Sequence, residues 1–279
     1  MPFLKRDGGE LFYEVIDLVP SWRRDRQTIV FHHGIAATSD VWTDWISLLC
    51  HHYAIVRFDL RGFGQSRLDG DPLSYSMPDL MADLLAVAAA CGAERFHLVG
   101  ESLGGTVGLA TAIAHSERVL SLTVSNGAHR GMSIKNVRSW RDDIAREGRP
   151  AWARHMTDCR LFPEAVDRDK HEWFYQQHLT CSADAMLALA DLLLRTDLSD
   201  DVHAIAQPVL LLSPDSSPFI PVSVMADLHA RLPDSELQVF AHSRHGLPLS
   251  HGAACGRTLA DFLVRRFAAT NARPPLPSP

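Results

Sequence analysis

Leu98-Val99-Gly100-Glu101-Ser102-Leu103-Gly104-Gly105 is the most informative segment of this chain. It joins an apolar strand expected over 96–99 to an apolar helix expected over 107–114. A Gly-x-Ser-x-Gly turn in this context holds its serine in a strained conformation, with the hydroxyl above the sheet edge. The two glycines are needed because side chains there would collide with the tight turn. A serine that merely caps the helix is the alternative, and the strand–turn–helix context favours a nucleophile.

The composition of the 279 residues is that of an ordinary globular protein, with 46% apolar and 22% charged residues. The length allows one large α/β domain with an insertion. A net charge of −6 gives no electrostatic reason to expect nucleic acid or an anionic membrane as a partner. The five scattered cysteines and the lack of an apolar leader or membrane-length segment favour a cytoplasmic protein. We expect a monomer or homodimer that binds a small-molecule substrate.

Apolar strands alternate with helices along most of the chain. The expected strands cover 11–16, 28–31, 54–58, 96–99, 120–124, 208–212 and 237–240. The turn signal Asp7-Gly8-Gly9 places the first of them in an antiparallel edge hairpin. Ser76 and Pro78 begin a helix that ends at Gly92. This alternation predicts a mostly parallel, eight-stranded sheet flanked by helices on both faces.

The alternation stops between about 133 and 206, where the sequence is helical and rich in tryptophan, histidine and arginine. We therefore expect a helical cap at 133–206, inserted into a core made of 1–132 and 207–270. Residues 271–279 are proline-rich, which predicts a flexible tail.

Three motifs occur in an order typical of one superfamily. They are His33-Gly34, the segment Asp59-x-Arg61-Gly62-x-Gly64-x-Ser66, and Gly100-x-Ser102-x-Gly104. On these motifs the chain resembles the α/β-hydrolase superfamily over nearly its whole length. The segments Asn126-Gly127-Ala128, Trp140-Arg141-x-x-Ile144 and 188–192 resemble the 3-oxoadipate enol-lactonase branch. The resemblance implies an α/β-hydrolase fold with a cap, and a hydrolase without a metal or organic cofactor.

The fold alone does not fix the reaction. The resemblance implies a serine hydrolase of a small ester or lactone, including carboxylate-bearing enol-lactones and intermediates of aromatic degradation. The alternatives are a carbon–carbon bond or amide hydrolase, a cofactor-free oxygenase, and a catalytically impaired member that only binds a ligand. Haloalkane dehalogenase and epoxide hydrolase chemistry are disfavoured, because those relatives carry an aspartate in place of Ser102.

Ser102 is the expected nucleophile, and a serine hydroxyl needs a base within hydrogen-bond reach. The superfamily order is serine, acid, histidine, which places the base after the last strand. His245 fits better there than its rivals His242 and His251. The resemblance also implies an oxyanion hole made by the backbone N–H groups of Ile35 and Leu103.

The acid is where the sequence departs from the superfamily. The two usual acid positions hold Ser217 and Asn126, so neither offers a carboxylate. Our leading hypothesis is that Asp215 orients His245, although this aspartate could instead hold its own loop. The second possibility is a weakened triad in which Asn126 or Ser217 only holds the imidazole tautomer. Replacing the acid by an amide in a serine protease lowers the rate by about 10⁴.

Aromatic and basic residues of the expected cap suggest how substrate is held. Trp140 is expected to line an apolar pocket, and Arg141 or Arg154 to bind a substrate carboxylate. The structural alternative for each is a tryptophan in the core or an arginine on a solvated face. Trp152, Trp173 and Phe174 are further pocket candidates.

Overall fold

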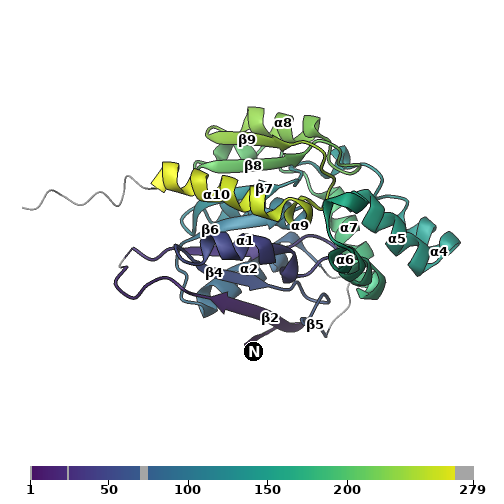
Figure 1. Cartoon of the computed structure of the whole chain (residues 1–279), viewed down its shortest axis with the longest axis horizontal. Helices are drawn as coiled ribbons and strands as arrows, with labels where there is room; N and C mark the ends of the chain where they lie inside the picture. Colours follow the sequence, from purple (N-terminus) through teal and green to yellow (C-terminus); the bar gives the residue numbers. More distant parts are fainter. Residues whose placement is uncertain (1, 24, 70–74, 268–279) are drawn as a thin grey trace, which may run out of the picture.

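One β-sheet forms the centre of the fold (Figure 1). The computed structural model describes residues 2–23, 25–69 and 75–267. Its strands are β1 (Phe3–Arg6), β2 (Gly9–Ile16), β3 (Thr28–His32), β4 (Ala54–Phe58), β5 (Arg67–Leu68), β6 (Phe96–Glu101), β7 (Val119–Ser125), β8 (Val209–Pro214) and β9 (Ser235–Phe240). They lie in the order β1-β2-β4-β3-β6-β7-β8-β9, with β5 paired to β2.

The sheet is mostly parallel, as the alternation of strands and helices predicts. All neighbouring pairs from β4 to β9 are parallel, and the edge pairs β1·β2 and β2·β4 are antiparallel. The sheet has nine strands where we expect eight, because two residues, Arg67 and Leu68, pair with Gly9 and Glu10 at the edge. A Cβ on Gly9 would lie 2.2 Å from the Arg67 carbonyl oxygen, so this pairing needs glycine there.

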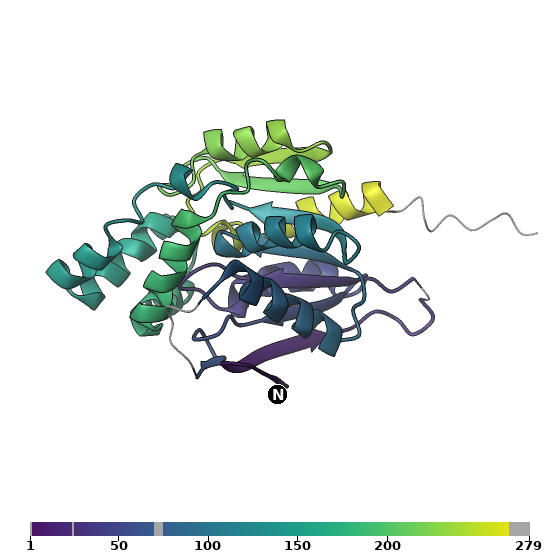
Figure 2. The same ribbon diagram turned by 180° about the vertical axis from the view of Figure 1, so that it is seen from behind.

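Helices cover both faces of the sheet (Figures 1 and 2). On one face lie α1 (Thr43–Leu49) and α10 (Gly252–Phe267), and on the other α2 (Met77–Ala90), α3 (Leu103–Ala114) and α8 (Val222–Arg231). Helix α2 begins as predicted, since the Ser76 side chain accepts the N–H of Asp79. Gly92, with φ of 70°, follows its end.

Four helices stand between β7 and β8, beyond one end of the sheet (Figure 1). They are α4 (Trp140–Glu147), α5 (Arg149–Arg160), α6 (Arg168–Thr180) and α7 (Ala183–Arg195). They lie in the segment 133–206, over which a cap is expected, and the term cap refers below to these four helices and the loops that join them. The expected tail at 271–279 lies outside the described residues. In the described part of the chain, no helix combines the length and apolar character needed to cross a membrane.

Candidate active site

Ser102 stands at the junction of β6 and α3, with φ of 54° and ψ of −114°. The turn can be this tight because of its glycines. A Cβ on Gly100 would lie 2.1 Å from the Gly104 carbonyl oxygen, and a Cβ on Gly104 would lie 2.2 Å from the His32 carbonyl oxygen. The Ser102 N–H donates to the Ser125 carbonyl at 3.0 Å, which joins the turn to β7. The backbone therefore stores local strain where a nucleophile elbow requires it.

His245 lies beside this serine. Its Nε2 is 3.0 Å from Ser102 Oγ, and the ring is buried. The loop that carries it runs from β9 to α9 (Leu247–Ser250), and the Gly246 N–H donates to the Arg160 carbonyl at 2.8 Å. This bond to α5 fixes the loop, so the histidine 143 residues further along the chain meets the serine.

The two rival histidines are occupied elsewhere. His242 is largely exposed, pairs with Glu164 at 3.0 Å and stacks on Phe162. His251 contacts Ser250 Oγ at 3.0 Å, beyond the end of α9. The geometry therefore brings His245, and neither rival, to Ser102.

The imidazole of His245 is held in its neutral form. Burial lowers its pKa well below the usual 6.5, and the charge of Arg160 lowers the pKa further. A neutral imidazole with a lone pair on Nε2 can accept the proton of the serine hydroxyl. The pair has the arrangement of a nucleophile and its general base.

Two neutral side chains meet the other ring nitrogen of His245. Asn126 Nδ2 lies 2.6 Å from Nδ1, and Ser217 Oγ lies 3.1 Å from it. Asn126 Oδ1 is buried without a hydrogen-bond partner among the described residues. Turning the amide by 180° places this oxygen on the Nδ1–H and leaves the Nε2 lone pair for the serine. Asn126 and Ser217 thus sit where a triad acid usually does.

The loop at Ile35 is fixed from two sides. His33 accepts the Leu60 N–H on Nε2 at 2.9 Å, which leaves its Nδ1–H to donate to the Gly34 carbonyl at 2.7 Å. This bond sets the peptide whose N–H belongs to Ile35. The Arg160 Nη1 donates to the Ile35 carbonyl at 2.9 Å and sets the next peptide. Ile35 lines one small cavity together with Ser102 and His245.

The other expected oxyanion donor follows the nucleophile directly. Leu103 is the first residue of α3, and the first N–H groups of a helix have no acceptor within the helix. The structure thus brings the loop after β3 and the start of α3 to the serine, at the carboxyl ends of adjacent parallel strands.

Comparisons with known proteins concern the fold. A family model described as alpha/beta hydrolase fold matches residues 27–158. Among solved structures, the enol-lactonase from Burkholderia xenovorans LB400 has a TM-score of 0.84 at 20% identity, covering 94% of this chain and 100% of that one. The meta-cleavage product hydrolase from Pseudomonas fluorescens IP01 has a TM-score of 0.79 at 17% identity, covering 95% and 98%.

This chain has the α/β-hydrolase fold. At these identities the two solved structures show the fold alone. A relative from Caulobacter sp. (strain K31), provisionally named carbamate hydrolase RutD, is 28% identical over 246 residues, which cover 86% of this chain and 91% of that protein. The names agree on hydrolysis and differ on the substrate.

Asp215 does not take the role that we expect for it in this hydrolase. Its carboxylate accepts the N–H groups of His242 at 2.8 Å and Ser243 at 3.1 Å. Desolvation raises the pKa of Asp215, but the hydrogen bonds, with these two among them, lower it by more, so the pKa lies below its usual value. Within the described residues, the hydrogen-bond partners of His245 Nδ1 are Asn126 and Ser217. The hypothesis that Asp215 orients His245 is therefore corrected, because this carboxylate holds the loop that carries the histidine.

Trp140 lies where the sequence predicts a pocket residue. It is buried, lines the cavity of Ser102, and packs edge-on against Trp152 and Phe219 at 5.6 and 5.9 Å between ring centroids. Trp152 supports it from behind and is not among the residues of this cavity. Trp173 and Phe174 also pack outside it, on α6.

The two arginines expected to bind a substrate carboxylate point away from the cavity. Arg141 is exposed and pairs with Asp191 at 3.5 Å. Arg154 is exposed, with its guanidinium 5.2 Å from the ring centroid of Tyr175. Each arginine directly follows a buried residue on its helix. Successive side chains of a helix point in different directions, so the arginine side chain lies on the solvent side. This corrects their assignment as substrate-binding residues.

The structure brings two further charged residues to the site, which no motif in the sequence marks. Arg160 is 3% exposed and lines the cavity of Ser102. Glu101 is 5% exposed, and its Oε1 lies 3.6 Å from His245 Nε2. A signal for Arg160 was present: it stands four residues after Met156 and seven after Ala153, on the buried face of α5.

The cavity beside Ser102 is almost filled. Its volume is about 10 Å³, and its walls are mostly apolar side chains from the cap and from the loops of the core. Ile134, Val137, Leu193 and Ile220 complete these walls. A substrate of several heavy atoms therefore needs side chains of the cap to move before it can reach the serine.

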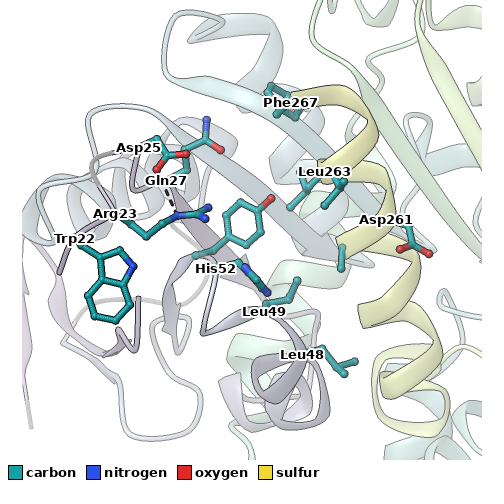
Figure 3. A pocket seen from close by; sticks show the side chains of 13 residues that line it. Trp22, Arg23, Asp25, Gln27, Leu48, Leu49, His52, Asp261, Leu263 and Phe267 are labelled. Carbon is teal, nitrogen blue, oxygen red and sulfur yellow. Dashed lines mark ion pairs between the residues drawn. The ribbon is translucent and has the colours of Figure 1, made fainter. Parts of the chain in front are cut away.

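A much larger hollow lies at the opposite end of the strands (Figure 3). Its volume is about 860 Å³, and its walls come from the loop before β3, the end of α1 and the last turns of α10. Arg23 and Asp25 form an ion pair at 3.4 Å there, and Trp22 is exposed. Gln27 precedes β3 and lines this hollow, whereas Ser102 follows β6. This hollow and Ser102 therefore lie at opposite ends of the sheet.

In the described part of the chain, no cluster of three or more histidine, cysteine, aspartate or glutamate side chains is arranged to hold a metal ion.

Proposed function

We propose that this hydrolase is a serine hydrolase of a small ester or lactone that carries a carboxylate. The observation that carries the proposal is the 3.0 Å contact between Ser102 Oγ, in its strained turn, and His245 Nε2. Strain at a buried polar residue is costly and points to a functional constraint.

The reaction follows from this geometry. Ser102 Oγ attacks the carbonyl carbon while its proton passes to His245 Nε2. The N–H groups of Ile35 and Leu103 stabilise the oxyanion. The proton on Nε2 then passes to the leaving alkoxide as the carbon–oxygen bond breaks, which leaves an acyl group on Ser102. Water, deprotonated by His245, releases the acid and restores the serine.

Two unpaired donors support a substrate with an anionic group. The Nε–H of Arg160 and the indole N–H of Trp140 are both buried and lack an acceptor among the described residues. Both residues line the cavity of Ser102. Because leaving a buried donor unpaired is costly, a carboxylate that accepts from either would be bound favourably. Arg160 thus replaces Arg141 and Arg154 as the arginine for this role.

A carbamate or amide substrate is the second candidate. It is favoured by the name of the relative from Caulobacter, carbamate hydrolase, and 91% of the length of that relative aligns with this chain. The same acyl-transfer chemistry would apply, with a nitrogen leaving group in place of the alkoxide. A cofactor-free oxygenase or a member that only binds its ligand would instead leave Ser102 without an acyl-enzyme.

The test is covalent labelling of the purified protein with a fluorophosphonate, followed by intact mass. We expect one phosphonate adduct in the wild type and none in Ser102→Ala, with strongly slowed labelling in His245→Ala. The surface variant Trp22→Ala is the control and should label like the wild type. A screen of carboxylate-bearing and neutral esters, lactones and carbamates then identifies the substrate. A folded wild type that remains unlabelled would rule out the serine-hydrolase assignment.

A further inference from the structure

Transfer of the serine proton creates a positive imidazolium at His245. In serine hydrolases a carboxylate on Nδ1 stabilises that charge. Here Nδ1 meets the neutral groups of Asn126 and Ser217. The charge of Arg160 further disfavours a positive ring, since it lowers the pKa of His245. A hydrolase built on this pair needs a negative charge from somewhere else.

Glu101 supplies a carboxylate on the opposite side of the ring. Its Oε1 lies 3.6 Å from His245 Nε2. This distance is too long for a hydrogen bond, so Nε2 stays directed at Ser102 Oγ, which is 3.0 Å away. It is short enough for strong attraction between opposite charges in a buried site. Both side chains are almost fully buried, and solvent therefore screens the pair very little.

The position of Glu101 is fixed by the elbow itself. It is the last residue of β6 and directly precedes Ser102. A Cβ on Gly34 would lie 2.0 Å from Glu101 Oε2, so only glycine at that position leaves room for the carboxylate. The Gly34 N–H and the charge of Arg160 both favour the ionised form. Burial acts against them and raises the pKa of Glu101 to about 7.

We propose that Glu101 takes over the electrostatic work of the missing triad acid, by stabilising the imidazolium of His245 from the Nε2 side. The proton of Ser102 moves to Nε2 as the Oγ–carbon bond forms, and it stays there while Glu101 remains a carboxylate. The proton then leaves with the alkoxide, which returns the ring to its neutral form. Glu101 acts through His245 and gains or loses no proton in the cycle.

A purely structural role is the competing explanation. Glu101 also balances the buried charge of Arg160, which belongs to α5 of the cap. It also contacts Gly34 in the loop before Ile35. In that case its loss would weaken the fold or displace the loop, and a new acid at Nδ1 would repair neither. The two explanations therefore differ in whether an acid at position 126 can rescue the loss of Glu101.

The experiment measures fluorophosphonate labelling rates at pH 8 in Glu101→Gln, Asn126→Asp and the double variant, with thermal unfolding of each. The amide of Glu101→Gln keeps the shape and the acceptor for Gly34 but removes the charge. We expect it to slow labelling by about 10²-fold, less than the 10⁴ known for loss of a directly bonded acid. Adding Asn126→Asp should recover at least about tenfold, because this substitution places a carboxylate on Nδ1. Glu117→Gln is the matched control, since Glu117 is an exposed carboxylate just before β7, and this variant should label at the wild-type rate.

Labelling of Glu101→Gln within threefold of wild type overturns the inference. A loss that Asn126→Asp does not relieve overturns it too and assigns Glu101 to the structural role. If Glu101→Gln does not fold, Glu101→Asp keeps the charge and withdraws it from Nε2. We then expect a loss of about tenfold that Asn126→Asp relieves, and unchanged labelling contradicts the inference. The inference rests on the proposed function, whose failure is seen separately as a wild type that is not labelled at all.

Discussion

The large hollow at Trp22 and the small cavity at Ser102 differ in size, exposure and the charges that they hold. The one at the amino ends of the strands is wide and open, with a volume of about 860 Å³ and an exposed Trp22 at its rim. The one at the carboxyl ends has a volume of about 10 Å³, and its walls come from the cap and from the loops of the core. The small cavity holds the strained serine, a buried histidine and the buried arginine.

This contrast shows that desolvated charge marks the candidate site better than volume does. Burial lowers the pKa of His245 and raises that of Glu101, and buried groups with shifted pKa values are typical of functional sites. In the large hollow, Arg23 and Asp25 pair in contact with solvent, where an ion pair contributes little. If function and stability divide between the two ends in this way, substitutions at the two ends should have different effects.

The largest difference is expected in stability. Trp152→Ala removes a fully buried ring that supports Trp140, and we expect it to lower the free energy of unfolding by about 3–5 kcal/mol. Trp22→Ala removes a ring that is 80% exposed, and should change it by less than about 0.5 kcal/mol. Urea unfolding of both variants measures the two values. Equal losses would mean that the large hollow is structurally as important as the cap.

The next effect concerns the substrate. Arg160→Met should lower kcat/KM for a carboxylate-bearing ester, relative to a neutral ester of the same shape, by about 10²-fold. The ratio cancels any common effect on Ser102. Arg154→Met lies on the exposed side of the same helix and serves as the control. An unchanged ratio in Arg160→Met would leave the unpaired Nε–H without a role in binding.

The stability of the fold should depend on pH through a histidine at the amino ends of the strands. His97 is buried on β6, contacts Ser121 Oγ at 2.8 Å and Gln27 Oε1 at 3.1 Å, and burial lowers its pKa to about 3. Below pH 6.5, His97 binds a proton in the unfolded chain but not in the folded chain. The free energy of unfolding therefore falls as the pH falls. In His97→Gln the slope between pH 6 and 4 should be smaller by about 1.4 kcal/mol per pH unit. An identical slope would show that His97 accepts its proton in the folded state.

The smallest effect tests the corrected assignment of Asp215. Asp215→Asn should reduce kcat by less than about threefold, because its oxygens accept backbone N–H groups of the loop, and an amide oxygen can still accept one of them. The thermal midpoint should fall slightly. A hundredfold loss of kcat with an intact fold would show that Asp215 acts as the triad acid. The electrostatic role of that acid would then not need to be assigned to Glu101.

Much of the fold could be predicted from the sequence because its signals are local. The apolar runs specify strands, the Ser76 cap and Gly92 limit α2, and the glycines of the elbow report a turn that admits no side chain. The two-residue strand β5 was missed, since pairs of this length carry no periodic signal.

The candidate site was predictable only in part. Ser102 and His245 follow from motif and chain order, and their contact agrees with that expectation. The acid was not predictable in this way. Asp215 is the nearest carboxylate along the sequence, yet its loop geometry turns it toward backbone N–H groups. Arg154 and Arg160 lie on opposite faces of the same helix, and Arg141 lies on the exposed face of another, which the residue type alone does not reveal.

The sequence by itself determined the α/β-hydrolase sheet, the strained turn at Ser102 and the histidine that follows the last strand. These are short-range patterns of apolar residues, glycines and chain order. Only the tertiary structure decided which charges surround the imidazole. Glu101, Arg160 and Asn126 come from β6, α5 and the end of β7, and their effect on His245 depends on distances of a few ångströms in a buried site. Electrostatic energy in such a site varies steeply with distance and burial, which no pattern along the chain records.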